Sequence, residues 1–234
     1  MIQEIIIPLI SLIALEIILG IDNLIFISIL SDKLPPEKRS RLRFIGIGLA
    51  LIIRLLLLTA IAWILKLDNT LFTIFETAIS GKGLILIIGG LFLIYKSTKE
   101  IHHKTLSTQT GSVIENINTH SFKKLLGEIV LLDIVFSIDS IITAVGMVTE
   151  LWIMYTAVIV SLVVMLFAAK PLNEFISKNP SFQIVALSFL MMIGVALLGE
   201  GLHFEIPKGY IYFSMAFAFL VDIIQMKTVK NEKK

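Results

Sequence analysis

The chain has 234 residues, of which 56% are hydrophobic and 16% are charged, and its mean hydropathy is +0.93. Soluble domains contain about 45–50% apolar and about 25% charged residues, so this composition excludes an ordinary soluble protein and indicates a membrane protein with several spans. The net charge is only +2, and the chain lacks cysteine, which excludes a disulfide framework and a thiolate metal site.

Seven apolar stretches follow one another along the chain, each of a length that can cross a bilayer as a helix. We predict spans at residues 4–30, 43–66, 80–97, 124–148, 152–172, 182–202 and 209–226. The third is the weakest, because its apolar core from Gly83 to Tyr95 covers only ~20 Å at 1.5 Å per residue. The segment Leu71–Ser80 before it is expected to lie in the outer interface or to re-enter. The predicted fold class is an all-α, polytopic membrane helical bundle with seven transmembrane helices.

Basic residues are distributed unevenly between the two sides of this bundle. Sixteen of the 20 lysines and arginines fall on one side, in the loops at 31–43, 96–124 and near 175 and in the C-terminal tail. Because cytoplasmic loops contain the excess of Lys and Arg, we expect the C-terminus to be cytoplasmic and the N-terminus to lie outside. Opposite locations of the two termini require an odd number of spans, and seven satisfies this.

A motif in the first span returns in the fourth. Residues 16–23 read EIILGIDN, and residues 133–140 read DIVFSIDS, 117 positions later. The matched acids are more informative than the matched Ile and Leu residues, because carboxylates inside spans are costly and usually functional. The first span runs inward and the fourth outward, so the motifs are antiparallel and predict an inverted repeat of three plus three spans. Transporters with such repeats have their sites between the repeats, near the midplane.

The repeat divides the chain into four parts. We predict a first three-helix repeat at 1–97, a polar cytoplasmic linker loop at 98–123, a second three-helix repeat at 124–204, and a seventh helix with a basic cytoplasmic tail at 205–234.

The first motif places Glu16, Gly20 and Asn23 on one face of an ideal helix, whereas Asp22 points about 120° away. Glycine costs helix stability, so the helix could break locally at Gly20. Such a break would turn both acids inward. The break would also free backbone carbonyls as ligands.

The second motif repeats this stripe with Asp133, Ser137 and Ser140, and leaves Asp139 off it. Ser137 corresponds to the glycine, and its hydroxyl could bond back to a carbonyl and bend the helix.

Inverted symmetry predicts which acids meet. Counted by depth in the membrane, Glu16 should approach Asp139, and Asp22 should approach Asp133. Two carboxylates this close cannot both stay ionised without a cation or a shared proton.

A ligand set made only of oxygen atoms suits Mn²⁺, Ca²⁺ and Mg²⁺. The structural alternative is that the acids are helix-packing groups paired with Arg54, which lies within the second span. A buried arginine is expected to pair with a carboxylate from the first or fourth span. Arg54 is then either a latch that holds the bundle together or a counter-ion that exchanges with the metal during transport.

These residues resemble those of the TerC family of integral membrane proteins. The resemblance is based on residues 16–28 (EIILGIDNLIFIS), 133–140 (DIVFSIDS), 89–93 (GGLFL) ahead of 99–102 (KEIH), and 206–217 (IPKGYIYFSMAF). It extends over nearly the whole chain. It implies a seven-span protein of the bacterial plasma membrane, related to lysine-exporter-type and Ca²⁺/Mn²⁺ antiporter folds, with manganese efflux and a link to tellurite resistance.

The resemblance also implies a metal site, which can be assigned residue by residue. Its acidic site falls on Glu16, Asp22, Asn23, Asp133 and Asp139. Ser137 and Ser140 match the motif as weaker ligand candidates.

We expect a secondary transporter that exports Mn²⁺, or Ca²⁺ or Mg²⁺ in its place, from the cytoplasm. The sequence has no nucleotide-binding motif, so energy must come from ion gradients. Four acids against one Mn²⁺ and Arg54 leave one negative charge, which favours proton antiport. The sequence shows no nucleophile–base set, so we expect no enzyme activity, no organic cofactor and no nucleic-acid partner.

Two alternatives belong to other classes. The protein could export an amino acid or another small metabolite on a related fold, which would need a recognition site of mixed charge. It could also be a membrane scaffold that delivers metal or stress signals to membrane or envelope protein partners, as a homo-oligomer or otherwise.

Overall fold

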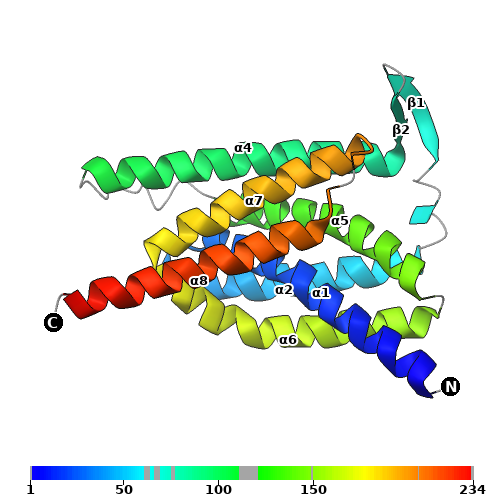
Figure 1. Ribbon diagram of the computed structural model, residues 1–234, viewed down its shortest axis with the longest axis horizontal. Helices are drawn as coiled ribbons and strands as arrows, with labels where there is room; N and C mark the ends of the chain where they lie inside the picture. Colours follow the sequence, from blue (N-terminus) through cyan, green and yellow to red (C-terminus); the bar gives the residue numbers. More distant parts are fainter. Residues whose placement is uncertain are drawn as a thin grey trace.

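The computed structural model describes residues 2–60, 64–65, 69–74, 77–110, 121–148, 150–204 and 206–232. These residues form seven long helices: α1 (Ile2–Ser31), α2 (Pro36–Thr59), α4 (Gly81–Thr110), α5 (Phe122–Met147), α6 (Leu151–Lys178), α7 (Pro180–Gly201) and α8 (Lys208–Glu232). An antiparallel hairpin of β1 (Thr70–Ile74) and β2 (Thr77–Ser80) precedes α4. The helices extend along one long axis, with the N-terminus and the hairpin at one end and the C-terminus at the other (Figure 1).

The bundle is apolar on the outside and carries charge on the inside. Large apolar side chains such as Phe167, Phe213 and Phe44 are 70–79% exposed, whereas the acids of both motifs are buried. This is the reverse of a soluble domain and suits a hydrocarbon solvent. Five helices, α1, α2, α5, α6 and α7, are long and apolar enough to cross a membrane. The chain is therefore an all-helical, multi-pass membrane protein.

The predicted third and seventh spans correspond to α4 and α8, which are not among these five helices. Helix α4 is 30 residues long, but Lys82, Lys96, Lys99 and Glu100 leave only a short apolar centre, as the sequence predicted. Helix α8 has an apolar stretch at Gly209–Gln225.

Two segments differ in form from the sequence-based expectation. The segment Leu71–Ser80, expected in the outer interface or re-entering, falls within the hairpin of β1 and β2. Helix α4 continues to Thr110, so residues 98–110 of the expected linker loop are helical. Residues 111–120 lie outside the described part.

Helices α4 and α7 pack antiparallel and close together through pairs of glycines. A Cβ at Gly90 would lie 2.5 Å from the carbonyl oxygen of Gly194, and a Cβ at Gly201 would lie 2.7 Å from that of Gly83. Small residues let two helix backbones approach in this way. Gly90 and Gly194 therefore lie in direct contact, whereas Gly89 packs against Val135 of α5.

The predicted helix breaks at Gly20 and Ser137 are absent, because α1 and α5 are continuous through both positions. Gly20 instead leaves room for Met165 of α6, whose sulfur would collide with a Cβ there. The absence of a side chain at Gly20 is used for helix packing and not for unwinding.

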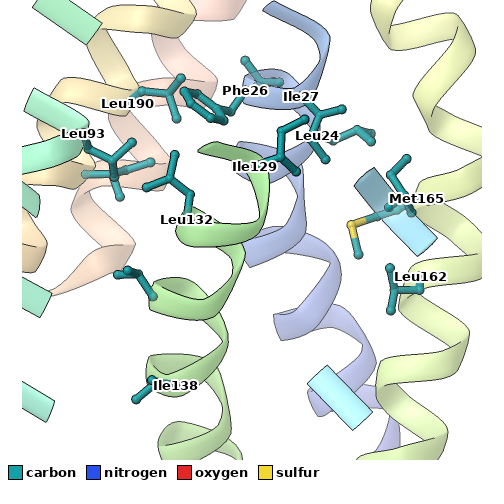
Figure 2. Packing of buried hydrophobic residues seen from close by; sticks show 14 of the residues in the cluster. Leu24, Phe26, Ile27, Leu93, Ile129, Leu132, Ile138, Leu162, Met165 and Leu190 are labelled. Carbon is teal, nitrogen blue, oxygen red and sulfur yellow. The ribbon is translucent and has the colours of Figure 1, made fainter. Parts of the chain in front are cut away.

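The apolar core extends through the bundle and includes residues of α1, α2, α4, α5, α6 and α7. Figure 2 shows Leu24 and Ile27 of α1 near Ile129 of α5. Met165 and Leu162 of α6 lie at the right of the view, on the side of α1 that faces away from α5. All five are buried or line the central cavity described below. This packing holds α1 and α5 together so that their acidic motifs face common neighbours.

Candidate functional site

The acids of both motifs and one arginine are buried within the bundle. Glu16 and Asp22 come from α1, Asp133 and Asp139 from α5, and Arg54 from α2, and each residue is only 2–4% exposed. Buried charges are unfavourable unless they are paired or bind an ion. The sequence pattern therefore identified groups that the fold collects in its interior.

Arg54 bridges the first acid of each motif. Its Nη1 donates to Glu16 Oε2 at 2.5 Å, and its Nε donates to Asp133 Oδ1 at 3.4 Å. The predicted pairing of Arg54 with a carboxylate of the first or fourth span is confirmed, and Arg54 contacts both spans. With both acids ionised, this triad has a net charge of −1.

A small cavity adjoins the triad. Its volume is about 20 Å³, enough for one water-sized guest. Asn23, Arg54 and Asp133 supply its polar wall, and apolar side chains of α1, α2, α5 and α6 form the rest. The buried Asn23 Nδ2 has no hydrogen-bond partner among the described residues, so this cavity has polar capacity for a guest.

The serines of the second motif bond within α5. Ser137 Oγ donates to Asp133 Oδ2 at 3.4 Å, and Ser140 Oγ donates to the Ser137 carbonyl at 3.3 Å. Ser137 therefore supports the triad, whereas Ser140 is directed back to its own helix.

The second acid of each motif lines a different cavity. Asp22 and Asp139 share this second cavity, also about 20 Å³, with Tyr212 of α8. Its remaining wall is apolar and consists of Leu19, Phe136, Ile193, Ala196, Leu197 and Ile211. Lys82 Nζ lies 3.7 Å from Asp139 Oδ1 and 2.9 Å from Glu200 Oε1. The second cavity therefore combines two carboxylates, a phenol and a nearby ammonium group.

The acids thus group differently from the sequence-based expectation, in which Glu16 approaches Asp139 and Asp22 approaches Asp133. Both first acids contact Arg54, and both second acids line the second cavity. The reason is the helix face: acids six residues apart point about 120° away from each other. The direction of each side chain around its helix therefore decides which groups it meets, and its depth along the helix does not.

Within the described part of the chain, no three His, Asp or Glu side chains are placed to hold one metal ion together. A cation in the second cavity would be bound by two carboxylates, with the remaining coordination from the phenol oxygen or water. Ions such as Mn²⁺ and Mg²⁺ accept such mixed oxygen ligands.

A polar network lies at the C-terminal end of the bundle. Arg39 Nη1 donates to Asp32 Oδ1 at 3.3 Å, and Ser177 Oγ donates to Asp32 Oδ2 at 3.0 Å. Burial raises the pKa of Asp32 above its ordinary value, although the Ser177 hydrogen bond and the Arg39 charge oppose the shift. Lys33 and Glu100 form an ion pair beside this network. These contacts connect α1, α2, α4 and α6 and close this end of the bundle.

Sequence reasoning missed Tyr212 and Lys82 as members of the site. Tyr212 lies within the stretch 206–217 on which the family resemblance partly rests, so a signal existed. Lys82 is separated from both motifs in the sequence, and only the packing of α4 against α5 and α7 brings it to Asp139.

The fold and its buried charged groups define a multi-pass membrane protein with an ionisable interior. The chain belongs to the family described as "Integral membrane protein TerC family", whose model matches residues 1–234. No solved structure matches it.

Curated relatives agree with this membership. A UPF0053 protein of Haemophilus influenzae is 48% identical over 94% of this chain and 93% of its own length. The UPF0053 inner membrane protein YgdQ of Escherichia coli K12 is 44% identical over 95% of this chain and 92% of its own length. The chain matches only 43% of the length of the UPF0053 inner membrane protein YoaE, also at 44% identity. The names of these relatives describe inner membrane proteins, which agrees with the apolar exterior of this chain.

Proposed function

We propose that this protein is a secondary transporter that exports Mn²⁺ or a similar hard divalent ion. The observation that supports this most directly is the second cavity, in which Asp22 and Asp139 line one small buried space. Two carboxylates balance the charge of one divalent cation, and oxygen ligands favour Mn²⁺, Ca²⁺ or Mg²⁺ over softer metals. The ion is the substrate, and it passes through chemically unchanged, without an enzymatic reaction or an organic cofactor.

The size of the cavity favours an ion over a metabolite. Sites for organic ligands have volumes of roughly 300–1,000 Å³, whereas each buried cavity here measures about 20 Å³. An amino-acid exporter would also need a cation positioned for the substrate carboxylate. Arg54 is already engaged by Glu16 and Asp133, and Lys82 is engaged by Asp139 and Glu200.

The arrangement of the helices supports an inverted repeat as the framework for transport. Helices of one triplet (α1, α2, α4) pack mainly against helices of the other (α5, α6, α7): α1 packs on α6, α2 on α5, and α4 on α7. The acids of both triplets lie at this interface, where alternating-access transporters bind substrate. The termini lie at opposite ends of the bundle (Figure 1), which agrees with an outside N-terminus and a cytoplasmic C-terminus.

The charges of the site favour exchange with protons. With a divalent ion between Asp22 and Asp139, the triad of Glu16, Arg54 and Asp133 retains one negative charge. Protons that bind Asp22 and Asp139 after the ion has left would replace its charge, so that the ion and the protons compete for the same carboxylates. A proton gradient would then drive the export.

Flux into sealed proteoliposomes tests the proposal. Wild-type protein should move Mn²⁺ against its gradient when an opposing proton gradient is imposed, and should not move amino acids. Asp22→Asn and Asp139→Asn should abolish the flux while the protein still inserts. Glu37→Gln, which alters an exposed acid, is the matched control and should transport normally. Wild-type flux in both site variants would refute the assignment, and absence of metal flux from wild-type protein would favour the scaffold alternative.

A further inference from the structure

Lys82 lies between two carboxylates of different burial. Its Nζ is 2.9 Å from Glu200 Oε1 and 3.7 Å from Asp139 Oδ1. The Asp139 side chain is 6% exposed, that of Lys82 is 17% exposed, and that of Glu200 is 24% exposed. Exposure therefore increases from Asp139, in the wall of the second cavity, through Lys82 to Glu200.

The neighbours of Lys82 fix its backbone, and its head group lies between two carboxylates. Lys82 is the second residue of α4, and the Gly83 amide donates to Ser80 Oγ at 3.0 Å. A Cβ at Gly83 would lie 2.9 Å from the carbonyl oxygen of Gly201, so α4 contacts α7 closely at this point. The lysine side chain has a flexible four-carbon stem and a compact ammonium charge. A small rotation of that stem moves the charge between Asp139 and Glu200.

We propose that Lys82 is a tethered competitor of the transported cation, an inference that depends on the proposed function. Without a divalent ion, the ammonium group neutralises part of the charge on Asp139. When the ion binds to Asp22 and Asp139, it repels the ammonium group from Asp139, and the ammonium group then pairs with Glu200 alone. When the ammonium group returns to Asp139, it weakens the binding of the ion and promotes its release toward the hairpin end.

This arrangement meets a general requirement of transport. A site must bind its ion strongly enough to load and weakly enough to release it. Two buried carboxylates alone would hold a divalent cation tightly, because charges in a low-dielectric interior interact strongly. Lys82 lowers that affinity without occupying the cavity permanently.

Binding of Mn²⁺ to the purified full-length protein, measured by calorimetry at constant pH and ionic strength, tests the inference. Lys82→Met and Lys82→Gln should tighten binding roughly tenfold, because a positive charge within ~4–6 Å of a carboxylate has effects of this order. Lys82→Arg should bind nearly as wild type does. Glu200→Gln should weaken binding of Mn²⁺, because it removes the ion pair between Lys82 and Glu200. The ammonium group then stays closer to Asp139 and competes with the ion.

A double-mutant cycle separates competition from general electrostatics. If Glu200 acts through Lys82, Glu200→Gln should have little effect in the Lys82→Met background. If Glu200 acts on the ion directly, Glu200→Gln should weaken binding equally in the wild-type and Lys82→Met backgrounds. This result would overturn the inference.

The matched control is the second Lys–Glu pair of the same helix. Lys96 of α4 lies 2.7 Å from Glu128 of α5, and neither residue lines the second cavity. Lys96→Met should leave Mn²⁺ affinity unchanged.

The outcomes separate the inference from the proposed function. If wild type binds Mn²⁺ and Lys82→Met binds it equally or more weakly, the competitor role is wrong and the transporter proposal stands. If wild type binds no Mn²⁺, Ca²⁺ or Mg²⁺, the proposed function fails, and the role of Lys82 fails with it. If both Lys82→Met and Lys82→Gln bind Mn²⁺ more tightly than wild type does, the competitor role and the proposed function are both supported.

Discussion

Arg54 of α2 and Glu16 of α1 form an ion pair in which Nη1 and Oε2 are 2.5 Å apart and both side chains are only 3% exposed. The same guanidinium group reaches Asp133 of α5. One side chain therefore connects three helices in the interior of the bundle. This places the first acid of each motif in a structural ion cluster and leaves the second acids to line a separate cavity.

Replacing Arg54 should destabilise the protein strongly. Arg54→Met leaves Glu16 and Asp133 buried without their cation, and removing one partner of a buried ion pair costs about 3–5 kcal/mol. Arg54→Lys should be intermediate, because one ammonium group cannot reproduce the two-sided contact of a guanidinium. Thermal unfolding in detergent measures both variants. Adding Glu16→Gln to Arg54→Met should restore part of the loss, and an unchanged unfolding temperature for Arg54→Met would contradict the latch.

Tyr212 should contribute to cation binding through its hydroxyl. Tyr212→Phe keeps the ring in the wall of the second cavity but removes one oxygen ligand or hydrogen bond, worth about 1 kcal/mol. The expected loss of Mn²⁺ affinity is therefore roughly fivefold. Tyr210→Phe is the control, because Tyr210 is 73% exposed and lies two residues away on the same helix. Equal effects of the two changes would exclude a role for the phenol oxygen.

Cation binding should weaken as the pH falls. A carboxylate ligand must be deprotonated to bind a metal, so binding of Mn²⁺ to Asp22 and Asp139 competes with protons. Calorimetry in detergent should show that the affinity for Mn²⁺ decreases from about pH 8 to about pH 5. This range lies above the ordinary pKa values of carboxyl groups. The binding enthalpy should also vary with the ionisation enthalpy of the buffer. Constant affinity without proton release would refute proton antiport and leave a uniporter or a delivery site.

The contact between α4 and α7 should not tolerate a side chain at Gly90. A Cβ there would lie 2.5 Å from the Gly194 carbonyl oxygen and 2.9 Å from the Leu198 amide nitrogen, and backbone atoms cannot move aside cheaply. Gly90→Ala should destabilise the protein by about 1–3 kcal/mol. Gly48→Ala should be neutral or stabilising, because nothing lies within 4 Å of its Cβ position and alanine favours helix. Thermal unfolding of the two variants checks this difference.

The sequence by itself determined the class of the protein, most of its helices and the residues of its charged interior. Apolar length is a local property, so spans such as 124–148 agree closely with α5 (Phe122–Met147). The cost of placing Glu16, Asp22, Asp133 or Asp139 in hydrocarbon is also local, so their positions within apolar stretches are enough to make these acids site candidates. The pairing of Arg54 followed from the same cost.

Only the tertiary structure decided which charged groups meet. The direction of a side chain around its helix depends on how the helices pack, so depth in the membrane wrongly predicted the partners of Glu16 and Asp22. Helices α1 and α5 remain unbroken because neighbouring helices surround both faces that carry acids, and no unwinding is needed to bury them. Lys82 and Tyr212 reach Asp139 and its cavity from α4 and α8, through contacts between segments that no local pattern in the sequence connects.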